Sequence, residues 1–241
     1  MRSPLCIPAA RMNRGVVSLA AICFLFVVLP ALAEDDEKTG LESWYTSTVV
    51  SGRGGYRVTH YWSRGSALRS QTLVGVSPVT TIVRGDRYWV YDELLGEGIE
   101  VKRSPQTTAE DEKRKRPFGN DLEALIRAGG ELVETGLLSG IPAETWRVTN
   151  SQGRRTVWVR VAEPRVPLRV ENFSRESGES ATLSYSNWAS GFEIPDKFFE
   201  PPADLQFKKF EYEAYVAESL KGPVGPAPIL YPELIHGPRP Q

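Results

Sequence analysis

The 241-residue chain is poor in the residues on which catalysis and metal binding usually depend. It has only two cysteines and two histidines, and the histidines, His60 and His236, lie far apart in the sequence. It contains no G-x-S-x-G nucleophile motif, no P-loop and no H-E-x-x-H zinc motif. A catalytic pair of carboxylates that the fold brings together would have no such sequence motif. We therefore expect a protein that is not an enzyme and holds neither a metal ion nor a cofactor.

Long apolar runs are also scarce, and the one clear example lies at the N-terminus. Arg2, Arg11 and Arg14 form a basic segment without acidic residues, and a mostly apolar stretch follows at residues 16–29. Ala31-Leu32-Ala33 then provides the small residues of a cleavage site. Because the apolar stretch is short for a bilayer span, residues 1–33 are predicted to be a signal peptide that is cleaved after Ala33.

Cleavage of this segment would change the composition of the chain. It would remove both cysteines, Cys6 and Cys23, so that no disulfide could form. Cys23 could also mark a lipoprotein, but Ile22 before it is larger than the residue that lipidation requires. Three arginines would be lost as well, and the remaining excess of acidic residues argues against a nucleic-acid partner. We expect a soluble, exported protein, which in a Gram-negative bacterium is periplasmic.

The chain is rich in short segments that favour β-strands. Tyr56, Val58, His60 and Trp62 alternate on one face of a strand, and β-branched and aromatic residues recur at 88–91, 157–161 and 168–170. Glycine-containing turn signals separate such segments every eight to twelve residues or so. This spacing predicts consecutive antiparallel hairpins with about eleven strands, at residues 44–101 and 131–187.

Between the two β-rich regions the pattern becomes helical. Thr107 and Glu110 fit a capping box, and a charged helix is predicted from there to Pro117. Asn120 or Asp121 can begin a second helix, which Gly129-Gly130 would end. The apolar stripe of this second helix consists of Leu122, Leu125 and Ile126.

The C-terminal residues 221–241 differ again in composition. They include six prolines and three glycines, which favour an extended backbone rather than helix or sheet. We expect a Pro-rich, loosely held tail. The apolar residues at 229–231 and 234–235 leave a docked segment as the alternative.

Several segments together resemble one protein family. Residues 81–92, TIVRGDRYWVYD, resemble the strand–turn–strand of the LolA/LolB-like periplasmic carriers, the outer-membrane lipoprotein-sorting family. Tyr61-Trp62-Ser63-Arg64 resembles its aromatic strand that ends in a basic residue, and Pro117-Phe118 resembles the start of its central helix. Residues 198–202, FFEPP, resemble its near-terminal motif. The resemblance spans residues 44–202 in the order that the family requires.

The resemblance implies a mainly β (α+β) fold. A strongly curved antiparallel sheet would form an incomplete barrel covered by a short helical lid, in a domain at residues 34–220. It also implies a monomeric carrier that takes lipid, or the acyl chains of lipoproteins, from a membrane-bound donor protein towards an acceptor at the outer membrane. The alternative is a non-catalytic envelope sensor or interaction module of the same fold.

The resemblance also implies particular site residues. An arginine at the end of the aromatic strand would hold the lid closed, and Arg64 is the first candidate, with Arg69 as its rival. The apolar cavity would be drawn from both halves of the sheet and from the second helix. Which strand parity faces inward stays open where both are apolar, as at residues 88–91. The predicted cavity residues are Trp62, Leu73, Ile82, Trp89, Tyr91, Leu122, Leu125, Ile126, Val157, Val159, Leu168, Val170, Leu183 and Tyr185.

Overall fold

The computed structural model describes residues 41–53, 55–111 and 113–237. The predicted signal peptide and the start of the predicted domain therefore lie outside the described residues. No helix in the described ranges has the length and apolar character that crossing a membrane requires.

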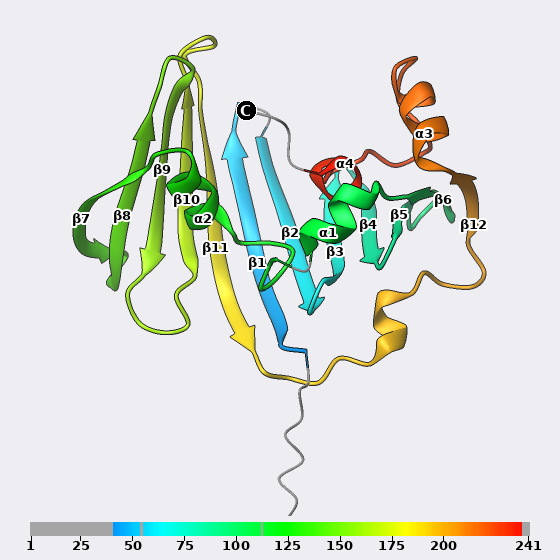
Figure 1. Cartoon of the computed structure of the whole chain (residues 1–241), viewed down its shortest axis with the longest axis horizontal. Helices are drawn as coiled ribbons and strands as arrows, with labels where there is room; N and C mark the ends of the chain where they lie inside the picture. Colours follow the sequence, from blue (N-terminus) through cyan, green and yellow to red (C-terminus); the bar gives the residue numbers. More distant parts are fainter. Residues whose placement is uncertain (1–40, 54, 112, 238–241) are drawn as a thin grey trace, which may run out of the picture. The chain divides into compact units, whose positions relative to one another are not determined.

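A single twelve-stranded sheet forms the described part of the chain (Figure 1). Its strand order is β12-β6-β5-β4-β3-β2-β1-β11-β10-β9-β8-β7, and the two edge strands do not pair with each other. The curved sheet is therefore an incomplete barrel, as predicted. The strands are β1 (Ser43–Gly52), β2 (Gly55–Arg64), β3 (Ala67–Val74), β4 (Ser77–Arg84), β5 (Arg87–Asp92), β6 (Glu97–Lys102), β7 (Glu131–Leu138), β8 (Ile141–Thr149), β9 (Gly153–Arg160), β10 (Pro167–Ser174), β11 (Ser180–Ser190) and β12 (Gln206–Phe210).

Eleven of these strands pair antiparallel with one another, in agreement with the predicted hairpins. The twelfth, β12, was not predicted and pairs parallel with β6. Its five residues include Lys208 and Lys209 and carry little of the pattern expected for a strand.

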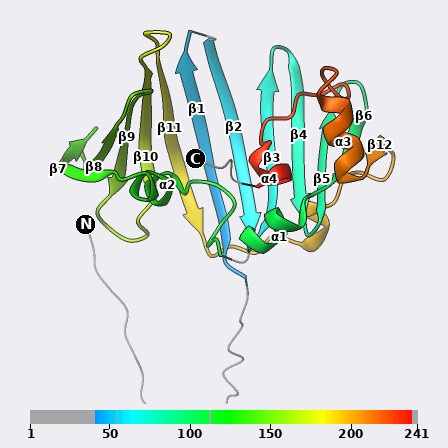
Figure 2. The same ribbon diagram turned by 45° about the horizontal axis from the view of Figure 1, so that its top comes forward.

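The short helices lie on one face of the sheet, between its two edges (Figures 1 and 2). They are α1 (Pro105–Asp111), α2 (Asp121–Arg127), α3 (Tyr212–Ser219) and α4 (Glu233–His236). A 3₁₀ helix, η1 (Asp196–Phe199), lies in the segment that connects β11 to β12. The predicted second helix is confirmed as α2. The first is shorter than predicted, because it ends at Asp111 rather than near Pro117.

Arg116 shows why the first helix stops early. Its buried guanidinium lies over the rings of Trp44 and Trp188, at 4.7 and 5.1 Å from their centroids. It also donates to the carbonyl oxygens of Phe118 and Gly119. A helical path through Arg116 would forgo these contacts, so tertiary packing overrides local helical propensity here.

The strand register assigns each side chain to one of two faces. Consecutive cross-strand partners from β1 to β6 are Trp44, Ser63, Leu68, Val83, Tyr88 and Val101, and they share the face that carries the helices. We call it the helix-covered face. The next residue in each strand points the other way. Those partners are Tyr45, Trp62, Arg69, Ile82, Trp89 and Glu100, on what we call the opposite face.

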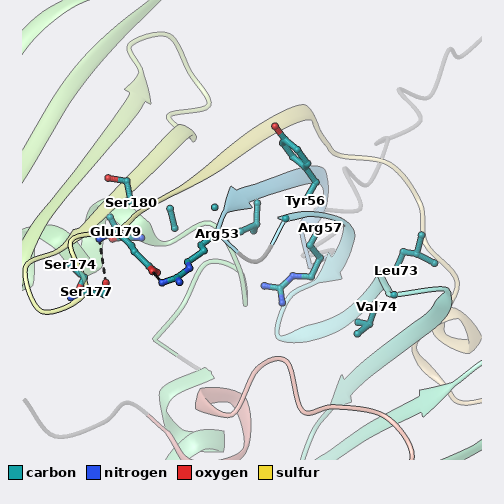
Figure 3. A pocket seen from close by; sticks show the side chains of 15 residues that line it. Arg53, Tyr56, Arg57, Leu73, Val74, Ser174, Ser177, Glu179 and Ser180 are labelled. Atoms are coloured by element: carbon teal, nitrogen blue, oxygen red, sulfur yellow. Dashed lines mark hydrogen bonds and ion pairs between the residues drawn. The ribbon is translucent and has the colours of Figure 1, made fainter.

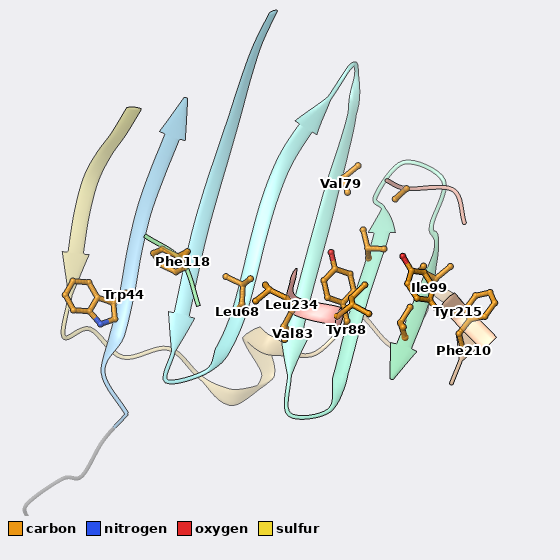
Figure 4. Close-up of a cluster of buried hydrophobic side chains, with 14 of the residues drawn as sticks. Trp44, Leu68, Val79, Val83, Tyr88, Ile99, Phe118, Phe210, Tyr215 and Leu234 are labelled. Carbon is orange, nitrogen blue, oxygen red and sulfur yellow. The ribbon is translucent and has the colours of Figure 1, made fainter. Parts of the chain in front are cut away.

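The C-terminal segment, residues 211–237, packs on the helix-covered face of β3–β6 (Figure 4). Leu234 and Ile235 are buried against Leu68, Val83 and Tyr88. Polar contacts fix the segment as well: the backbone N–H of Ser104 donates to the Ile235 carbonyl oxygen at 3.0 Å. The expectation of a loosely held tail is thus wrong for residues up to 237, since its apolar residues belong to the core.

Candidate ligand-binding surface

The predicted cavity residues do not share one face of the sheet. Five of them, from the first half of the chain, lie on the opposite face, away from α1 and α2. They are Trp62, Leu73, Ile82, Trp89 and Tyr91. The prediction that these five line one cavity together with the residues beneath α2 is wrong. A shift of one residue along a strand moves a side chain to the other face of the sheet. At residues 88–91 both parities are apolar, and the sequence pattern could not distinguish them.

Most of the residues on the opposite face form a small core of their own. Ile82 and Tyr91 are buried together with Ile194 and Phe199, and Trp62 and Trp89 pack against them. The cover here is the segment around η1. Leu73 is the exception, because 55% of its surface is exposed at the end of β3.

Arg64 and Arg69 both hold this η1 segment. Arg64 pairs with Asp196 and donates through Nη1 to the Ile194 carbonyl oxygen at 2.6 Å. Arg69 donates through Nη1 to the Phe198 carbonyl oxygen at 3.1 Å, and its guanidinium lies over the Phe198 ring. The prediction that either arginine contacts the helical lid is therefore wrong: each fixes a covering segment, but on the opposite face of the sheet.

The predicted residues from the second half of the chain do meet α2. Leu125 is fully buried with Val157, Val159 and Val170. Around this cluster pack Leu122, Leu183 and Tyr185, with Trp146 and Val148, which were not predicted. Ile126 is 46% exposed, and Leu168 occupies an irregularity of β10 outside all three clusters.

A cavity of about 420 Å³ lies where the two coverings of the sheet meet. It separates α2 from the C-terminal segment, and its lining includes the buried side chains of Leu68, Phe118 and Leu234. Tyr61, Tyr185 and Tyr231 add aromatic walls. We call it the central cavity. The sequence analysis found only Tyr185 of these residues as a site residue, although Tyr61 and Phe118 stand in motifs that it singled out.

Asp121 organises the polar side of the central cavity. Its Oδ1 accepts a hydrogen bond from Arg155 Nη2 at 2.6 Å, and its Oδ2 accepts one from the Tyr185 hydroxyl at 2.7 Å. Burial, and then the neighbouring Asp121 carboxylate, raise the pKa of Tyr185 well above its usual value. Tyr185 is therefore a neutral donor at ordinary pH. These bonds join the start of α2 to β9 and β11.

The two remaining tyrosines of the cavity contact each other. The Tyr231 hydroxyl donates to the Tyr61 hydroxyl at 3.2 Å, linking the C-terminal segment to β2. Burial, and then Tyr231, raise the pKa of Tyr61 above its usual value. The cavity wall thus consists of neutral aromatic groups, while Arg114, Arg127 and Arg155 line it as cations.

A larger hollow of about 570 Å³ lies at the end of the sheet where the β1–β2, β3–β4 and β10–β11 turns gather (Figure 3). Arg53 pairs with Glu179 across it, and Leu73 and Val74 stand at its side. None of the described side chains that line it is buried. This hollow is an open depression between turns, whereas the central cavity has a buried apolar floor.

Within the described residues, no three His, Cys, Asp or Glu side chains lie close enough together to hold a metal ion. The lining of the central cavity combines a buried apolar floor, aromatic walls, fixed polar groups and three arginines.

The sequence matches no protein-family model and no curated protein. Among solved structures, an uncharacterised conserved protein from Thermus thermophilus is 12% identical, with a TM-score of 0.50 over 70% of this chain and 90% of that one. MucB in the Pseudomonas aeruginosa MucA/MucB complex is 16% identical, with a TM-score of 0.43 over 68% of this chain and 57% of that one. The Mycobacterium tuberculosis lipoprotein LppX is 13% identical, with a TM-score of 0.38 over 66% of this chain and 91% of that one. At this identity the Thermus structure shows a shared fold alone, and membership of the LolA/LolB family stays a prediction.

Proposed function

We propose that the protein binds lipid, or the acyl chain of a lipoprotein, in the central cavity and releases it unchanged. It works in the periplasm after loss of its signal peptide, and carries its ligand from a membrane-bound donor towards an acceptor at the outer membrane. The observation that supports this proposal is the central cavity itself, with its buried floor of Leu68 and Phe118 beside the short helix α2.

The size and lining of the cavity favour a single hydrocarbon chain. A volume of about 420 Å³ is at the small end of the range for ligand pockets, roughly 300–1,000 Å³. Transfer of about ten methylene groups from water to such a surface gains roughly 8 kcal/mol before the cost of ordering. This gain is enough for a reversible carrier, and a larger cavity for several chains is not needed.

Helix α2 is suited to act as the movable cover. It has only seven residues, Leu125 is its one buried side chain, and Asn120 makes no side-chain capping bond. A helix this short has little stability of its own and depends on its contacts with the sheet. Opening α2 requires loss of the Leu125 contacts and of the Asp121 hydrogen bonds, while the strands beneath stay paired.

One observation favours the alternative, a non-catalytic sensor or interaction module. The edge strand β7 has eight residues, of which seven are exposed, and it contains neither lysine nor proline. Leu132, Val133 and Leu137 are exposed along it. Such an edge can pair with a strand of another protein. By contrast, the β12 edge is short and carries two lysines.

A cavity-filling variant tests the proposed function. Ala124 lines the central cavity, so Ala124→Trp should weaken binding of a fluorescent fatty-acid probe at least about tenfold. Ile126→Trp is the matched control, because Ile126 is exposed on the same helix and does not line the cavity. Equal binding by both variants and the unmodified protein would contradict the proposal.

Native mass spectrometry of the protein purified from a lysate that contains membranes separates the two functions. Lipid that co-purifies with the unmodified protein, and is lost from Ala124→Trp, supports the carrier. A bound protein that persists in Ala124→Trp and is lost from Val133→Pro supports the interaction module, since proline removes a hydrogen-bond donor from the β7 edge.

A further inference from the structure

The side chains that line the central cavity include more cations than anions. Its lining includes three arginines, Arg114, Arg127 and Arg155, and two acids, Asp121 and Glu233. Asp121 is already engaged, because one oxygen accepts from Arg155 and the other from Tyr185. A cavity with an aromatic floor therefore has one more cation than anion at its edge.

The rim arginines also have donors to spare. In the described ranges of the chain neither Arg114 nor Arg127 forms an ion pair, and the only side-chain bond of Arg127 is a long one, 3.4 Å, from Nε to the Glu123 carbonyl oxygen. The nearby acid Glu110 is bridged by Lys113 at 2.7 Å and attracts Arg114 and Arg127 without an ion-pair contact to either. Arg155 uses Nη2 on Asp121, whereas its buried Nε has no hydrogen-bond partner.

The arginines and the apolar floor occupy defined positions in the chain. Arg114 follows α1 and Arg127 ends α2, so the two come from the segments on either side of Phe118. A head group between them would leave the attached chain to contact Phe118 and Tyr61. Guanidinium groups bind carboxylate and phosphate with two parallel hydrogen bonds, which neutral or cationic head groups cannot accept.

We infer that the ligand of the central cavity is a single-chain amphiphile with one anionic head group, bound by Arg114 and Arg127 while its chain lies on the aromatic floor. This inference rests on the proposed function and specifies its ligand. A carboxylate and a phosphate ester share the required chemistry, so a fatty acid and a lysophospholipid are both suitable sources of the head group.

Calorimetric titration of the signal-free chain with four probes of equal chain length tests the inference. The probes are hexadecanoate, hexadecyl-chain lysophosphatidate, hexadecanol and hexadecyltrimethylammonium, each below its aggregation concentration. At least one of the two anions should bind about tenfold more tightly than hexadecanol, and the ammonium probe should bind most weakly. The tighter of the two anions identifies the source of the head group.

Paired variants locate the site of this preference. In Arg114→Gln/Arg127→Gln, the preference for the anion over hexadecanol should fall to within about twofold, because the affinity for the anion falls. Arg175→Gln, at an exposed arginine in the β10–β11 turn, is the matched control and should keep the preference.

The outcomes separate the inference from the proposed function. Equal affinities for hexadecanol and both anions would overturn the anionic head group and leave the lipid carrier standing. An anion preference that survives in the double variant would overturn the assignment to Arg114 and Arg127. Failure of all four probes to bind would overturn the proposed function itself.

Discussion

The two halves of the helix-covered face carry similar strands under very different covers. Over β3–β6 the chain lays down its own C-terminal segment, which buries Leu68, Val83 and Tyr88 almost completely. Over β8–β10, α2 is the one covering element among the described residues. Apolar side chains of α2 and of the neighbouring β7 edge, such as Ile126 and Leu132, stay exposed. The difference shows that similar strands can be covered almost completely or only in part, depending on which segments of the chain pack on them. The central cavity lies at the boundary between the two.

Removal of the C-terminal cover of β3–β6 should lower the stability of the protein more than any other change. A chain that ends at Lys221 would expose the apolar face of β3–β6 and lose the hydrogen bonds of Ile235, so we expect the free energy of unfolding to fall by about 5 kcal/mol or more. Urea denaturation followed by circular dichroism measures it. The point variant Leu220→Ala, at a side chain 83% exposed, is the control and should change stability by less than about 0.5 kcal/mol. A truncated chain of full stability would break the comparison.

The buried Arg103 should have the next largest effect, in the same half. Its Nε donates to the Leu234 carbonyl oxygen at 2.6 Å, and its Nη1 contacts Asp111 at 2.7 Å and the Gly85 carbonyl oxygen at 2.6 Å. Arg103→Met leaves the Asp111 carboxylate, only 10% exposed, without its partner, and we expect a loss of about 3–5 kcal/mol. A loss below about 1 kcal/mol in thermal or urea unfolding would show that Arg103 contributes little to holding the C-terminal segment.

Loss of the Arg64 contacts that hold η1 on the opposite face should lower the stability less. This variant tests whether the two faces of the sheet are independent. Arg64→Leu removes a partly exposed ion pair with Asp196 and a hydrogen bond to Ile194, so we expect a loss of about 1–2 kcal/mol in unfolding free energy. Lipid binding should not change, because Arg64 does not line the central cavity. Weaker or stronger binding of a fatty-acid probe would mean that the two faces are coupled.

The smallest change in stability at neutral pH is expected from Tyr88→Phe, in the half of the helix-covered face that the C-terminal segment covers. Burial raises the pKa of Tyr88, and no contact of its hydroxyl has good hydrogen-bond geometry, so the variant should be within about 0.5 kcal/mol of the unmodified protein at pH 7. Above pH 10 the unfolded chain ionises this tyrosine and the folded chain does not, so stability falls as the pH rises. Each such tyrosine contributes a slope of about 1.4 kcal/mol per pH unit. Stability measured from pH 8 to 11 should fall less steeply for Tyr88→Phe, and equal slopes would contradict the pKa assignment.

Sequence patterns predicted the fold well where one physical rule dominates. Alternation and turn signals located the antiparallel hairpins, and the apolar stripe predicted for the second helix includes Leu125, which is buried with Val157 and Val159. Parity failed in β5, since Tyr88 and Val90 face the helices while Trp89 and Tyr91 face η1, and all four are apolar or aromatic. Only the cross-strand register separates them, and register is a tertiary property.

Long-range covers were the other part that the sequence could not place. The composition of residues 221–237 predicted an extended Pro-rich segment, but α4 lies within it, and the burial of Ile235 depends on contacts with strands that lie more than a hundred residues earlier. Arg64 was expected to hold the helical lid, and it holds the η1 segment on the opposite face instead. The central cavity, formed between two covers, left no single sequence signal.

Hydrogen–deuterium exchange of the full described domain, with and without a saturating fatty acid, tests the central claim most directly. We predict added protection at residues 116–127 and in β9 and no loss of protection at residues 222–237, because the ligand enters beneath α2 and the C-terminal cover, which supplies Tyr231 and Leu234 to the cavity lining, stays in place. Faster exchange at residues 222–237 on ligand addition, with α2 unaffected, would contradict this prediction. It would assign the binding surface to the half of the helix-covered face that the C-terminal segment covers.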